Sequence, residues 1–437
     1  MYNEKKFSRT LWVNILCFMY ICAWIMLPAF RNATDSGIFR FVFFAVSGIW
    51  FITSIMVKSN WIDSILPAFL TVMFFLLFVT IYYIFGYGDV RANIFITPFF
   101  ILLCASMGWF YNYMNNEKVD KILIRTTIAC FIVTALTTIY NLRINMNASR
   151  KLASSSTPIE ERLYLESRNI GSFDFIYGIL ILLPMLIFII KSMKMQKKTM
   201  FLNIMIILLI IICIALANFT IAYFFLGISL LLIFIPAKRD LKVTGIIIAA
   251  VSVVCLPIII NVLIYILSIV VNYIPSIMTR NKINKIISLL SGNIEITDLS
   301  QRVSLLMNSI SSFISSPLIG IGAYYNSYDI VGGHSQFIDD FARYGIFGAT
   351  PLIMFFRKFR RYILKNISDI SLKNAYILSW LYFVILGLLN PVYGYGILFA
   401  VFVVLPTVIR DFQNKSNMSA NKKVALGGTQ NEDYVCD

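Results

Sequence analysis

Charged residues are scarce in this sequence. They make up 13% of its 437 residues, whereas a soluble chain carries about 25%. Hydrophobic residues make up 59%, and most of them fall into runs of about 17 to 25 residues, the length that crosses a ~30 Å hydrocarbon core as a helix. The ten-residue alternating segments of a transmembrane β-barrel are absent. The sequence therefore predicts an all-α polytopic membrane protein.

Motifs for nucleotides and metals are also absent. No GxxxxGK[ST] loop and no Asp-x-Asp pair occurs, so we expect no cofactor and no bound metal. Six of the seven cysteines lie in apolar runs, which argues against a disulfide framework or a CxxC site. The net charge of +16 comes from short tufts of Lys and Arg between apolar runs. This pattern favours contacts with membrane lipids and argues against nucleic-acid binding.

The apolar runs predict about twelve membrane spans. The first run is too long for a signal peptide and lacks a cleavage site, so we expect it to be retained. Most Lys and Arg fall in alternate connections, which predicts that both termini lie in the cytoplasm. The expected spans are 11–30, 39–57, 64–85, 93–113, 122–142, 172–190, 201–217, 220–236, 244–270, 346–356 with its preceding helix, 374–390 and 394–410.

Two outer segments are too long to be simple turns, and long loops are usually functional or disordered. The chain then divides into residues 1–142 (spans 1–5), 143–171 (first outer loop), 172–271 (spans 6–9), 272–345 (second outer loop), 346–410 (spans 10–12) and 411–437 (cytoplasmic tail).

Residues 301–315, in the second outer loop, predict an amphipathic helix on the membrane surface or over the bundle. Its apolar stripe is Val303, Leu306, Met307, Ile310, Phe313 and Ile314, and its opposite face is rich in Ser and Asn. A Pro317 helix stop and a turn with Gly320 and Gly322 follow. The sequence therefore predicts a surface helix and a flexible turn in the segment that leads to the only histidine.

That histidine, His334, follows Gly332 and Gly333 and precedes a new helix that begins near Ser335. The helix dipole there favours the neutral imidazole that a general base requires, and the exposed N–H groups favour a phosphate. A lone histidine at a helix start is more often a cap or a surface residue. Asp339 and Asp340 orient His334, contact hydroxyl groups of a substrate, or form a solvated helix face, and the pattern leaves these alternatives open.

The stretch from Arg302 to Gly348 resembles the signature region of Wzy-type O-antigen and capsular polysaccharide polymerases, within the O-antigen ligase superfamily. The resemblance covers about fifty residues and beyond them only the span count and the late outer loop. Its matching residues are Arg302, Pro317, Gly320, Gly322, His334, Ser335, Asp339, Tyr344, Gly345 and Gly348.

The resemblance implies a GT-C-like fold, a location in a bacterial cytoplasmic (inner) membrane, and a glycosyltransferase that takes undecaprenyl-diphosphate-linked oligosaccharide as its substrate. It implies His334 as the base, with Arg302 and Arg168 holding the diphosphate, although Arg168 could instead anchor its span at the membrane interface. Relatives often carry a Ser-Arg sequence between the seventh and eighth spans, and this chain has Ala217-Asn218-Phe219-Thr220 there. The expected substrate contacts are Ser335, Asp339, Asp340, Gly320, Gly322 and Gly333.

Three activities fit this sequence. The first is polymerisation, in which a growing glycan moves from polyprenyl diphosphate to the non-reducing end of another lipid-linked repeat unit. This reaction needs no metal. A chain-length regulator protein is a possible further partner of such a polymerase. The second is ligation of finished polymer to a lipid or protein acceptor. The third is a flippase for lipid-linked oligosaccharide, or another transporter. A transporter is expected to place charge inside its spans, whereas here polar residues gather in one outer loop, which favours glycan transfer.

Overall fold

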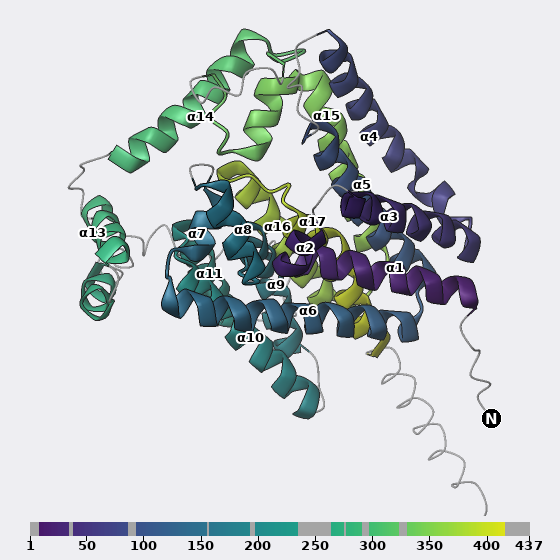
Figure 1. Ribbon diagram of the computed structural model, residues 1–437, viewed down its shortest axis with the longest axis horizontal. Coiled ribbons are helices and arrows are strands. Elements are labelled where there is room, and N and C mark those ends of the chain that lie inside the picture. Colours follow the sequence, from purple (N-terminus) through teal and green to yellow (C-terminus); the bar gives the residue numbers. More distant parts are fainter. Residues whose placement is uncertain are drawn as a thin grey trace, which may run out of the picture.

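The computed structural model describes residues 8–34, 38–85, 93–154, 157–192, 197–234, 264–274, 277–290, 297–322 and 330–415 (Figure 1). Every regular element in these ranges is a helix, which confirms the all-helical prediction. The α-helices are α1 (Arg9–Met26), α2 (Pro28–Thr34), α3 (Ile38–Val57), α4 (Trp61–Ile84), α5 (Asn93–Met114), α6 (Glu117–Ile144), α7 (Ala148–Ala153), α8 (Ile159–Ser167), α9 (Phe173–Ser192), α10 (Lys197–Ala217), α11 (Thr220–Leu231), α13 (Ile277–Leu290), α14 (Thr297–Ser315), α15 (Gln336–Lys365), α16 (Ile370–Leu389) and α17 (Tyr395–Phe399).

Eight helices among the described residues are long and apolar enough to cross a membrane, so the chain has the character of a multi-pass membrane protein. Two further expected spans are the shorter apolar helices Phe41–Val57 and Ile221–Phe234, and a third is described only over Ile264–Tyr273. The expected span at 346–356 is part of α15, which is not among the eight. These eight are Arg9–Met26, Trp61–Tyr82, Phe95–Met114, Glu117–Ile144, Phe173–Lys191, Thr199–Ala217, Ile370–Leu389 and Tyr395–Lys415.

The centre of the bundle is formed by α9 and by the last helix, Tyr395–Lys415, which begins as α17 and includes a π-helical turn at Ala400–Val404. Their apolar segments are 78% and 89% buried, whereas those of α4 and α10 are 28% and 33% buried. Helix α9 packs against α10, α16 and α17. A helix that is apolar all round is either a core helix or a membrane span, so the open faces of α4 and α10 are suited to lipid.

One end of the bundle, which we call the basic end, is where α6 begins and where α15 and the last helix finish. There the Arg410 guanidinium donates two hydrogen bonds to the buried Asp120 carboxylate, one of them 2.7 Å long. Gln413 at the end of the last helix donates to the backbone carbonyl of Asn366 (2.9 Å), directly after α15. Breaking a buried ion pair costs about 3–5 kcal/mol, so these contacts fix three helix ends to one another.

At the opposite end, which we call the site end, α14 and the first part of α15 lie beside the end of α4 (Figure 1). The Tyr82 hydroxyl of α4 donates to the carbonyl of Ile319. The ring of Phe75, also on α4, lies edge-on to that of Tyr344, with centroids 5.3 Å apart. These contacts attach the second outer loop to this end of the bundle.

Helix α15 is kinked at Gly345, whose φ of +60° is left-handed. The kink frees backbone groups that would otherwise pair within the helix, and the segment 317–322 takes them up. Ile321 and Gly322 donate to the carbonyls of Ala342 and Arg343 at 3.0 and 2.9 Å. In return Ile346 donates to Pro317, and Phe347 to Leu318, at 2.8 and 3.0 Å. We call this backbone pairing the clasp. It holds residues 317–322 against α15. We call residues 330–335, which contain His334, the histidine loop.

Candidate active site

The first turn of α15 carries a buried carboxylate network. Asp339 is 3% exposed, and its two oxygens accept hydrogen bonds from the Ser309 hydroxyl of α14 (2.6 Å) and from the backbone N–H of Ser335 (3.1 Å). The N–H of Gly332 in turn donates to Ser309 Oγ (2.9 Å). Asp339 therefore holds the backbone on both sides of His334, at Gly332 through Ser309 and at Ser335 directly. It is not part of a solvated helix face.

The neighbouring carboxylate, Asp340, is 5% exposed and accepts from Tyr393 (2.5 Å) and from Gln336 (3.1 Å). Burial raises the pKa of Asp340 from 3.8 to about 7, against the opposing effects of the Tyr393 hydrogen bond and the Arg343 charge. Burial and the charge of Asp340 also raise the pKa of Tyr393 far above its usual value. Tyr393 therefore stays protonated and donates a hydrogen bond to Asp340, whose pKa lies near neutral pH.

Three buried polar atoms around this turn have no hydrogen-bond partner among the described residues. They are Ser335 Oγ, Asn390 Nδ2 and Arg343 Nε. Asn390 is close to the helix start, because its carbonyl accepts from the N–H of Gln336 (3.4 Å). Unpaired buried polar atoms are costly, and they are expected where a polar substrate binds. The start of α15 therefore offers a hydroxyl, an amide and a guanidinium to a ligand.

His334 itself is exposed, two residues before α15 begins. Gly333, before it, has a φ of +68°, and Ser335, after it, is buried. The structure thus brings together four of the predicted site residues, His334, Ser335, Asp339 and Asp340, on one fixed loop and helix turn. An accessible imidazole on a fixed backbone suits a general base.

The predicted surface helix is present as α14. Its apolar residues Val303, Met307 and Ile314 are exposed, while Ser309 and Ser312 are buried against the histidine loop. Exposed apolar residues on one face fit a helix that lies at a membrane surface. The predicted site residue Arg302 belongs to this helix, but its side chain lies outside what the structure describes.

Of the predicted substrate contacts, Gly322 donates a hydrogen bond in the clasp, and Gly320 lies against the backbone of Arg343 and Gly345. Gly320 has a φ of +74°, and a Cβ there would lie 2.4 Å from the backbone of Arg343. A residue with a side chain would therefore push the turn away from α15. Both glycines have a structural role in the described contacts, and a contact with substrate stays a prediction for each.

Arg168, predicted to hold the diphosphate, is exposed at the end of α8 and is bound to its own helix. Its guanidinium donates to the hydroxyl of Tyr164 (2.8 Å) and lies 5.2 Å from that ring. The next residue, Asn169, has a φ of +55° and is held by Thr134 and Thr137 of α6. No contact between described residues joins Arg168 to either aspartate of α15.

A different arginine, Arg31 of α2, lies closer to the bundle core. Its side chain is 14% exposed, 3.7 Å from Glu166 and 5.5 Å from the centroid of the Tyr395 ring. Tyr395 follows Tyr393, the partner of Asp340, by two residues, and its backbone N–H donates to Asp174. The segment 390–395 therefore touches the α15 turn on one side and a cluster of Arg31, Glu166 and Asp174 on the other.

The residues that the sequence analysis missed are Arg343, Tyr393 and Arg31. Arg343 is three and four positions after the two aspartates, so the helical period could have placed it on the same face. Tyr393 could have been suspected from the Asn-Pro-Val-Tyr-Gly-Tyr turn between the last two expected spans. No sequence pattern indicates a role for Arg31 in the site, because only tertiary packing brings α2 to residues 390–395.

Within the described ranges, no group of three His, Cys, Asp or Glu side chains could hold a metal ion. Comparison with protein-family models finds none that matches this chain, and comparison with curated proteins finds no match either. The features that bear on function are therefore the geometry at the start of α15 and the resemblance of residues 302–348.

Proposed function

We propose that the protein is a glycosyltransferase that polymerises lipid-linked oligosaccharide repeats at the site end of the bundle. The growing glycan moves from polyprenyl diphosphate to the terminal sugar hydroxyl of a second lipid-linked repeat. The observation that carries the proposal is the Asp339–Ser309–Gly332 network, which fixes the backbone around an accessible histidine. The site end then faces the outside of a bacterial cytoplasmic membrane, as the distribution of Lys and Arg favours.

The chemistry needs a base and a positive charge. His334 takes the proton of the acceptor hydroxyl, whose oxygen attacks the anomeric carbon of the donor sugar. A new glycosidic C–O bond forms, the bond from that carbon to the diphosphate breaks, and polyprenyl diphosphate leaves with the electron pair. Arg343 and Arg302 stabilise the charge on the leaving diphosphate, because a guanidinium binds paired phosphate oxygens in a bidentate manner.

Asp339 acts as a positioning residue in this mechanism. Both of its oxygens are occupied by Ser309 and by the Ser335 backbone, so it holds the loop and leaves the proton transfer to His334. Asp340 and Tyr393 fix the other face of the same helix turn. The Ser335 hydroxyl and the Asn390 amide, both without partners, are suited to sugar hydroxyls.

The test uses purified protein and lipid-linked repeat units in detergent. His334→Ala should reduce polymer formation about 10²–10⁴-fold, the usual value of general base catalysis, and Ser304→Ala, an exposed position on α14, should not. The wild type should remain active with a chelator present. Wild-type polymer lengths from folded His334→Ala protein would refute the assignment of the base, and no polymer from folded wild type would refute the polymerase and favour transport.

A further inference from the structure

A cavity of about 180 Å³ lies inside the bundle, away from the α15 turn. It is lined by α1, α6, α9, α10 and the last helix, and most of its lining is apolar, including Phe131, Ile179 and Ile206. The apolar part of the cavity is suited to an apolar guest. The π-helical turn Ala400–Val404 contributes three lining residues, and such turns are frequent at functional sites.

The cavity becomes polar where it reaches the basic end. Thr199, Asn203, Asp411 and Lys415 line it there. The side chain of Asp411 is 5% exposed, and its Oδ2 accepts from Lys415 Nζ at 2.5 Å. Its other oxygen, Oδ1, is buried and has no hydrogen-bond partner among the described residues. This oxygen favours a ligand that brings an N–H or O–H donor.

Lys415 is the cationic half of the same pair. Its side chain is 43% exposed, so its ammonium can contact an anionic group while it stays near Asp411. The two side chains thus present a carboxylate oxygen and a cation side by side at the end of an apolar cavity. A headgroup that carries both an ammonium and a phosphate complements this arrangement in charge.

We propose that the cavity binds part of one acyl chain of a bilayer phospholipid with a primary-amine headgroup, such as phosphatidylethanolamine. The ammonium donates to Asp411 Oδ1, and the phosphate contacts Lys415. A choline headgroup has no N–H to donate, and a glycerol headgroup carries no cation. The lining continues from Lys415 to Met26 and Gly396 towards the other end of the bundle, as an extended chain requires. This site is separate from glycan transfer and does not depend on it.

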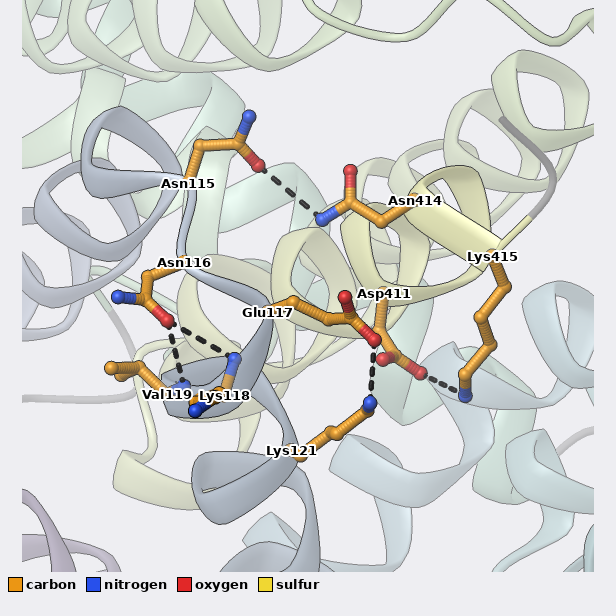
Figure 2. Close-up of polar contacts among 9 residues, drawn as sticks. All are labelled: Asn115, Asn116, Glu117, Lys118, Val119, Lys121, Asp411, Asn414 and Lys415. Atoms are coloured by element: carbon orange, nitrogen blue, oxygen red, sulfur yellow. Dashed lines mark hydrogen bonds and ion pairs between the residues drawn. The ribbon is translucent and has the colours of Figure 1, made fainter. Parts of the chain in front are cut away.

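A second ion pair with the same spacing provides a matched control. Glu117 and Lys121 of α6 pair at 2.5 Å beside Asp411 and Lys415, as Figure 2 shows. Glu117 is not among the residues that line the cavity. Glu117→Gln therefore removes one i,i+4 ion pair from the same end of the bundle without changing the proposed headgroup site.

The first experiment measures lipid retention by native mass spectrometry of the full-length protein. Phosphatidylethanolamine, phosphatidylcholine and phosphatidylglycerol with equal acyl chains are added in turn. We expect phosphatidylethanolamine to be retained roughly tenfold more than phosphatidylcholine, about the value of one charge-assisted hydrogen bond. Asp411→Asn should remove this preference and Glu117→Gln should keep it. Equal retention of the three lipids by the wild type would overturn the proposal.

The second experiment fills the cavity. Ile206 faces it and is 7% exposed, whereas Leu208 on the same helix is 46% exposed and does not line it. Ile206→Trp should abolish phospholipid retention and Leu208→Trp should not, with thermal unfolding of both variants as the check on folding. Unchanged retention by folded Ile206→Trp protein would overturn the proposal. Absence of any retained lipid from folded wild type would do the same.

Discussion

At the scale of single residues, Ser309 connects two parts of the site by hydrogen bonds. Its hydroxyl donates to Asp339 and accepts from Gly332, so Ser309→Ala leaves a buried carboxylate oxygen without its donor. We expect a loss of about 1–3 kcal/mol in the free energy of unfolding and a fall in polymer yield from protein that still inserts. Ser311→Ala, at an exposed position of the same helix, is the control. Equal effects of the two changes in thermal unfolding would show that the network contributes nothing.

Asp340 predicts a pH dependence of stability. Its pKa is raised from 3.8 to about 7, mainly by burial, so between these values the folded protein binds more protons at this site than the unfolded protein. The stability contributed by this group is therefore full below about pH 4 and decreases as the pH rises to about 7. Asp340→Asn removes this dependence, so the melting temperature of the wild type relative to the variant should fall across this window. A difference that stays constant from pH 4 to 8 would contradict the shift.

At the scale of elements, the clasp between residues 317–322 and α15 decides where the histidine loop lies. A Cβ at Gly345 would lie 2.4 Å from the carbonyl oxygen of Leu318, and its φ of +60° disfavours any side chain. We expect Gly345→Ala to cost about 1–3 kcal/mol and to reduce glycan transfer together with stability. Gly48→Ala on α3, where a Cβ meets nothing within 4 Å, should be neutral or slightly stabilising. The comparison is read from melting temperatures, and a neutral Gly345→Ala variant would show that the clasp is not needed.

At the scale of the whole molecule, the second half of α15 carries a cluster of positive charge towards the basic end: Arg357, Lys358, Arg360, Arg361 and Lys365. His334 lies at the opposite, site end. Reporter fusions after Lys365 and Lys415 should therefore report the cytoplasm, and fusions after Ser167 and Ile319 the outside. A cytoplasmic signal from Ile319 would contradict the proposed location of the active site.

The sequence by itself determined the helical membrane character of the chain, eight of its expected spans, the surface helix at 301–315 and the helix start after His334. These features follow from apolar run length, helical period and turn residues, which are local properties. Only the tertiary structure decided that Asp339 and Asp340 are buried, that Gly320 lies against the kink of α15, and that Arg31 approaches residues 390–395. Each of these involves segments far apart in the chain, and the burial of a carboxylate depends on neighbours that a local pattern does not contain.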